Sequence, residues 1–261
     1  MNFVNVVRFT VSDKISNLVK FFQFASETIA ELIAFRMNIN IGFIVLVRQI
    51  LFTGFEALGI ISLVSIAITG LIIIQGNSII PGFSQSAIFN TIFVSVITRE
   101  LSCILTAFII VARSGTAIST ELGNMAVNLE IESLISMKIS PISYLVVPRL
   151  VGVTVSMVLL TIYFNLMSIL GGYFMSLIIG DVSFIDYVFT ILANFTIADI
   201  LSTLFKSALF GIIISTVSSY EGLRVSFAST EVPQRTIKAV VQSLGMIIIF
   251  DIAITILTFY S

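Results

Sequence analysis

Five stretches of this sequence are apolar over lengths that allow a helix to cross a lipid bilayer. A helix rises about 1.5 Å per residue, so about 20 apolar residues span the hydrocarbon core of a membrane. Since 57% of the residues are hydrophobic and only 10% are charged, the composition argues against a soluble protein. We therefore predict an all-α integral membrane protein with spans at residues 50–74, 87–112, 150–178, 191–217 and 239–259.

The second stretch has two possible boundaries, which place Arg99 and Glu100 differently. The two residues lie near the middle of a span over 87–112, but at the mouth of a span over 99–119. Ionisable groups there are costly when they face lipid, so they should face a partner or a polar cavity. Neighbouring helical side chains point about 100° apart, which disfavours a mutual salt bridge. A lipid headgroup site and an ion-pair network between spans both remain open.

Small residues follow this pair at four-residue spacing: Ala112 with Thr116, and Gly115 with Ser119. Such spacing permits helices to approach closely. It fits either a contact between subunits or internal packing.

Residues 1–24 alternate apolar and charged side chains with helical spacing. The pattern predicts an amphipathic helix in the membrane interface, with a helix packed on the protein's own cytoplasmic face as the alternative. We expect one domain over 1–261, in which 1–40 form the interfacial region and 48–261 the transmembrane part.

Lysines and arginines gather in alternate loops. They precede span one, lie between spans two and three, and lie between spans four and five, whereas the other loops and the carboxyl terminus have none. The positive-inside rule therefore places the amino terminus in the cytoplasm and the carboxyl terminus outside. The residues are Arg8, Lys14, Lys20, Arg36, Arg48, Arg113, Lys138, Arg149, Arg224, Arg235 and Lys238.

A polar, amphipathic helix is predicted over 127–138, on the cytoplasmic side between spans two and three. Its acids lie near the start and Lys138 near the end, which suits the helix dipole, and Pro141 closes it. It fits equally a connector on the membrane and a docking helix for a soluble partner. The apolar face comprises Val127, Ile131, Leu134 and Ile135; the polar positions are Glu130, Glu132, Ser133 and Ser136.

Several kinds of chemistry are excluded by missing residues. The sequence has no histidine and one cysteine, so it has no histidine metal site, no Ser-His-Asp triad and no internal disulfide. No glycine precedes a lysine, so there is no Walker A loop. We expect no metal, no cofactor and no nucleic acid partner; if ATP powers this protein, another chain binds the ATP and its Mg²⁺.

Two functional classes compete on these residues. One is a transporter subunit whose work is supplied by a separate ATPase; the other is an ion- or proton-coupled secondary transporter. An odd number of spans without a visible repeat gives no support to the two-halves architecture of many carriers. A scaffold without transport is a third possibility. The carrier would use Glu56, Glu100, Asp199 or Asp251 as a relay.

Six short motifs in order resemble the MlaE/YrbE permease subunits of lipid-transport ABC systems. The resemblance extends from about Arg48 to Tyr260, and it departs from the family at Ser102-Cys103 and over Ser229 to Gln234. The motifs are Arg99-Glu100-Leu101, Ala112-Arg113-Ser114-Gly115, Glu121-Leu122-Gly123-Asn124-Met125, Ser140-Pro141, Val147-Pro148-Arg149 and Gly171-Gly172.

The resemblance implies a homodimeric permease that moves phospholipid or a related amphiphile between the inner membrane and an extracytoplasmic carrier with an MCE domain. Two ATPase copies would contact the cytoplasmic coupling helix, and the plastid inner envelope is the alternative compartment. Lipid-path candidates are Arg99, Glu100 and Gln75; coupling candidates are Glu130, Ile131, Glu132, Ser133, Leu134 and Met137; motif candidates are Arg113, Gly115, Glu121 and Gly123.

Overall fold

The computed structural model contains five helices that are long and apolar enough to cross a membrane, which confirms the predicted fold class. It describes residues 19–32, 39–80, 82–83, 86–179, 183–226 and 228–260, and no strand occurs among them. Most of the predicted interfacial helix over 1–24 lies outside these residues. A described helix over 19–32 packs on the fourth span, where the Phe21 ring meets Tyr220 edge-to-face at 5.3 Å.

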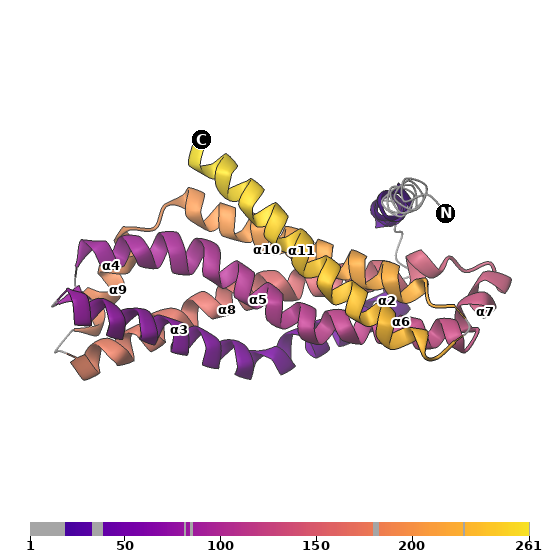
Figure 1. Cartoon of the computed structure of the whole chain (residues 1–261), viewed down its shortest axis with the longest axis horizontal. Helices are drawn as coiled ribbons and strands as arrows, with labels where there is room; N and C mark the ends of the chain where they lie inside the picture. Colours follow the sequence, from indigo (N-terminus) through magenta and orange to yellow (C-terminus); the bar gives the residue numbers. More distant parts are fainter. Residues whose placement is uncertain are drawn as a thin grey trace, which may run out of the picture.

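The long helices form an elongated bundle with a short helix at each end (Figure 1). At one end α7 connects spans two and three, and at the other α9 precedes span four. Span one comprises α2 (Ile39–Gly54), η1 (Phe55–Ala57) and α3 (Leu58–Ile79), and span two comprises α4 (Ala87–Ile92), η3 (Phe93–Leu101), α5 (Ser102–Ile110), η4 (Val111–Gly115) and α6 (Thr116–Val127). The remaining elements are α7 (Glu130–Ser136), η5 (Ile142–Val146), α8 (Val147–Ile179), α9 (Phe184–Ala193), α10 (Ile197–Leu223) and α11 (Glu231–Tyr260).

Several predicted span boundaries were wrong, and those of spans two, four and five matter most for the site. Span two runs continuously over Ile88–Val127, so each of its two predicted versions covers only part of it. Span four begins at Ile197, because α9 is a separate helix and Thr196 starts α10 with a capping box. The predicted polar loop over 218–238 is mostly helical, because the polar side chains at the end of α10 are buried in the bundle.

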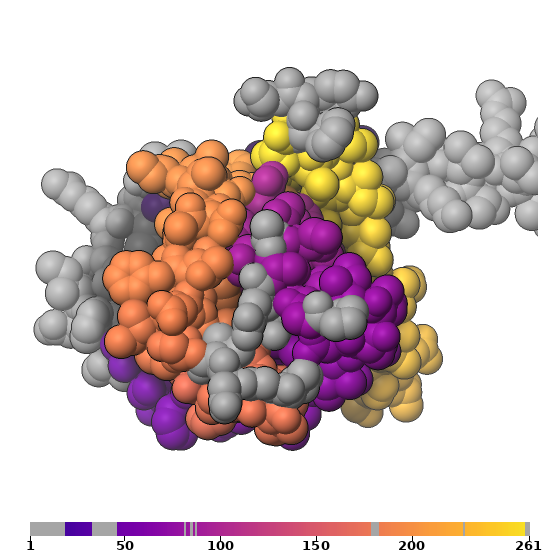
Figure 2. All heavy atoms as spheres, turned by 90° about the vertical axis from the view of Figure 1, so that its left-hand side faces the viewer, coloured from indigo at the N-terminus to yellow at the C-terminus, as the bar shows by residue number. Residues whose placement is uncertain are grey.

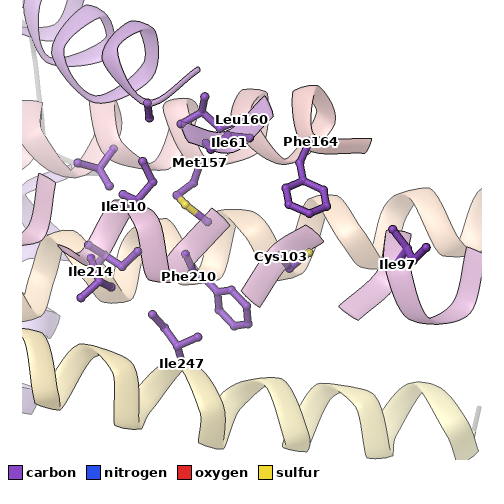
Figure 3. Packing of buried hydrophobic residues seen from close by; sticks show 14 of the residues in the cluster. Ile61, Ile97, Cys103, Ile110, Met157, Leu160, Phe164, Phe210, Ile214 and Ile247 are labelled. Atoms are coloured by element: carbon purple, nitrogen blue, oxygen red, sulfur yellow. The ribbon is translucent and has the colours of Figure 1, made fainter. Parts of the chain in front are cut away.

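The core is assembled from all five spans. Helix α8 packs along both α3 and α10, and α10 also packs against α11 and α6. Figure 3 shows buried side chains that meet in this core, and each span contributes at least one of them. Examples from the five spans, in chain order, are Ile61, Ile110, Met157, Phe210 and Ile247.

Glycines allow the closest helix approaches. A Cβ on Gly211 would lie 2.6 Å from the Thr154 Cα, so α10 and α8 touch backbone to backbone there. A Cβ on Gly115 would lie 3.1 Å from the Ser218 Oγ of α10. Gly115 and Ser119 are therefore packed inside the chain, whereas Ala112 is exposed, so both interpretations of the Ala112 and Thr116 pair stay open.

The end opposite α7 brings together parts of the chain that are distant in sequence. Figure 2 looks onto this end, where residues of α4 and η3 (purple) lie beside those of α9 and α10 (orange), with α11 (yellow) above. The end of α11 diverges from the bundle (Figure 1). The charged residues Arg99, Glu100, Asp199, Lys206 and Asp251 lie on these helices.

Candidate functional site: a charged cluster between spans two, four and five

Lys206 is the centre of the cluster, and its side chain is only 1% exposed. Its Nζ donates to the Glu100 Oε2 at 2.6 Å and to the Thr255 Oγ1 at 2.8 Å. The Asp251 Oδ1 lies 3.2 Å from the same nitrogen. One lysine of α10 therefore joins η3 of span two to α11, and two carboxylates compensate its charge.

Arg99 turns to a different partner. Its Nη1 lies 3.2 Å from the Asp199 Oδ1 near the start of α10. The other oxygen of Asp199 accepts hydrogen bonds from the Thr196 backbone at 3.0 Å and the Thr196 hydroxyl at 2.7 Å. The Thr203 hydroxyl donates to the backbone carbonyl of Asp199 at 2.8 Å. The capping carboxylate thus also anchors span two.

Arg99 and Glu100 therefore pair with α10 rather than with each other, as the geometry of neighbouring helical residues predicted. Their side chains remain 28% and 24% exposed, so each is paired yet still reachable. They lie on η3, a π-helical segment, and such segments are rare in proteins and frequent at functional sites. The ion-pair network between spans, one of the two interpretations of this pair, is present in the structure.

Gln75 does not join this cluster. It is exposed near the end of α3, where a loop had been predicted, and in the described part of the chain its side chain shares no hydrogen bond with Arg99 or Glu100. Its place in a lipid path stays a prediction.

The amphipathic helix between spans two and three is shorter than predicted. Helix α7 spans Glu130–Ser136, whereas Val127 ends α6 and Leu129, with φ of 59°, makes the turn between them. Ile131 and Leu134 pack toward the core, but Ile135 is 58% and Met137 62% exposed. Val127 does not belong to the predicted apolar face, because the left-handed turn at Leu129 separates it from α7; Ile131, Leu134 and Ile135 lie together on α7, and Ile135 is exposed.

The motif residues brace the bundle elsewhere. Arg113 pairs with Glu56, and its guanidinium lies 5.9 Å from the centre of the Phe52 ring. Glu121 lies 2.9 Å from Arg149, which also donates to the Leu145 carbonyl at 2.9 Å. A Cβ on Gly123 would lie 3.0 Å from Val225, so Gly123 permits close packing of α6.

A second group of ion pairs, around Arg235, was not predicted from the sequence. Arg235 lies 3.2 Å from Glu221 and 2.8 Å from Glu231, and the Ser226 backbone donates to Glu231 at 2.9 Å. This group closes the connection between α10 and α11 at the α7 end. The spacing of Glu231 and Arg235 at i, i+4 was the only available sequence signal. Among the described residues, no acidic or cysteine group is placed to hold a metal ion.

The sequence of this chain is similar to that of known membrane transport proteins. The Permease MlaE family matches residues 46–257. A probable ABC transporter permease protein of Rickettsia prowazekii is 29% identical over 214 residues, covering 82% of this chain and 83% of the relative. One from a Synechocystis species is 34% identical over 167 residues, covering 62% of each chain.

A further relative has a more specific description. The intermembrane phospholipid transport system permease protein MlaE of Haemophilus influenzae is 26% identical over 221 residues, covering 83% of this chain and 84% of the relative. ABC permease subunits are not themselves enzymes, because ATP is hydrolysed by a partner chain. The similarity to ABC transporter permeases decides against an ion-coupled secondary transporter. The match over most of its length shows that the chain belongs to the MlaE family of ABC transporter permeases.

Proposed function

We propose that this permease moves phospholipid or a related amphiphile between the inner membrane and an extracytoplasmic carrier with an MCE domain. It would act as a homodimer with two ATPase copies, its amino terminus in the cytoplasm and its carboxyl terminus outside. The description of the Haemophilus relative supports the substrate class. The segregation of lysine and arginine to one set of loops supports the orientation.

One observation carries the lipid path: a charged cluster with partly exposed cationic and anionic groups among apolar spans. A guanidinium binds phosphate through a planar fork of donors. Arg99, already held by Asp199, could offer its remaining donors to a headgroup phosphate, and Glu100 could accept from an amine. Gln75, which lies near the end of span one, is retained as a third candidate for the lipid path.

The ATPase would act on α7. Its exposed Ile135 and the following Met137 form an apolar surface outside the long helices, flanked by Glu130 and Glu132. Ile131 and Leu134 pack toward the core, so movement of α7 would be felt by the bundle. This supports the assignment of Glu130, Ile131, Glu132, Ser133, Leu134 and Met137 to coupling.

The lipid path can be tested by crosslinking. The permease is produced with its ATPase in nanodiscs that contain phospholipid, with a photoreactive residue at position 99 or 100. Positions 104 and 108, on the same span, are the matched controls. We expect lipid adducts from 99 and 100 that change on addition of ATP. Protein adducts alone, with transport surviving Arg99→Ala and Glu100→Ala, would remove the headgroup site.

A further inference from the structure

A cavity lies at the α7 end of the bundle, far from the charged cluster. It encloses about 670 Å³ between α2, α6 and the start of span three. Glu121 in its wall follows Glu100 by 21 residues in one continuous span, which is about 30 Å along a helix. The cavity is therefore separate from the proposed lipid path.

Two arginines line this cavity. Arg149 is 6% exposed, and although it pairs with Glu121, its Nε is buried without a hydrogen-bond partner among the described residues. Arg48 is exposed and has no ion-pair partner in the described part of the chain. With Glu121 as the only acid in the wall, the lining has an excess of positive charge.

The rest of the wall is mostly apolar. Phe52, Ile118 and Leu145 contribute side chains without hydrogen-bonding groups, and Tyr144 adds an amphipathic ring. Ligand pockets commonly combine such a lining with a few polar groups that fix orientation. The cavity thus suits a ligand with an apolar part and an anionic part.

The depth of the cavity indicates where such a ligand comes from. Arg48 lies two residues before the apolar stretch at 50–74, and Arg149 lies one residue before the apolar stretch at 150–178. Two residues of helix are about 3 Å, so both side chains lie close to the membrane boundary. Arginines at this level commonly contact lipid headgroups.

We propose that this cavity binds a phosphate-bearing lipid from the leaflet on the α7 side, with Arg48 and Arg149 at the phosphate and Phe52 beside the acyl chain. The site is additional to the transport path, and it does not depend on what the permease carries. Lipid there would fill the space between spans one, two and three and so hold α6, which leads directly to α7.

The test uses the permease–ATPase assembly in nanodiscs of phosphatidylcholine, with or without phosphatidylglycerol. A photoreactive residue at Tyr144 reports lipid adducts by mass spectrometry. We expect more adduct with phosphatidylglycerol, and a loss of about fivefold in Arg48→Gln. Lys238→Gln removes an exposed charge outside the cavity and should leave the adduct unchanged.

Two further arms make the result decisive. Ala117→Phe fills the cavity without changing its charge and should also lower the adduct. Inorganic phosphate should not compete; full competition by it, with no effect of Ala117→Phe, would mean a free-anion site and would overturn the lipid assignment. Adduct to a second permease copy or to the ATPase in place of lipid would overturn it as well. Crosslinking from positions 99 and 100 is scored separately, so failure here leaves the transport path untouched.

Discussion

Replacing Lys206 with methionine should destabilise the permease strongly. The substitution keeps an unbranched side chain of similar length but removes the cation that lies 2.6 Å from Glu100 and 3.2 Å from Asp251. Two largely buried carboxylates then face each other without compensation. Breaking a buried ion pair from one side costs about 3–5 kcal/mol. In a chain of this size, that corresponds to a fall of about 6–20 °C in the thermal midpoint.

The assay is thermal unfolding in detergent followed by circular dichroism, since the chain contains no tryptophan for fluorescence. Lys238→Met is the matched control, because Lys238 is exposed and should shift stability by less than about 0.5 kcal/mol. Adding Glu100→Gln and Asp251→Asn to Lys206→Met should restore most of the loss, because both acids become neutral. A midpoint equal to wild type, or no rescue by the triple variant, would refute the buried-network reasoning.

Three further predictions concern other parts of the chain. Glu130→Lys with Glu132→Lys should uncouple ATP turnover from lipid movement while leaving expression intact, and normal transport by an assembled double variant would remove the coupling assignment. Cysteines at positions 80 and 183 should react with a membrane-impermeant maleimide from outside and those at 132 and 228 only from inside, against a background in which Cys103 is buried; an inside signal at 183 contradicts the orientation. Gly211→Ala should lower stability by about 1–3 kcal/mol, since its Cβ would lie 2.6 Å from the Thr154 Cα, whereas Gly245→Ala meets nothing within 4 Å and should be neutral or stabilising in thermal unfolding.

The sequence predicted the features that depend on local pattern. Hydropathy over about 20 residues identified five spans, and helical geometry indicated that Arg99 and Glu100 turn to different partners. The boundary of span four was missed because α9 and α10 are both apolar. The capping box of Thr196 and Asp199 was the signal that could have placed the start of α10.

Pairs that join distant segments could not be predicted in the same way. Lys206 meets Asp251 and Glu100 because three spans converge, and no local pattern in a single sequence specifies which helices are neighbours. The turn before α7 was also hidden, since Leu129 takes a left-handed conformation that leucine rarely adopts. The same turn explains why Val127 does not belong to α7.

The continuity of span two links the two ends of the bundle. Arg99 and Glu100 lie near its start, and α7 follows its end after only two turn residues. The intervening helix is about 42 Å long from Arg99 to its end at Val127, and it carries a second π-helical segment, η4, where Arg113 pairs with Glu56 of span one. Regular α-helix transmits displacement as a stiff element, whereas a π-helical segment can change its hydrogen-bond register locally. We therefore expect a displacement of α7 to reach the charged cluster along span two, with η3 and η4 as the places where the helix adjusts. Because Lys206 ties η3 to both α10 and α11, any such adjustment must move three spans together or break the ion pairs that hold them.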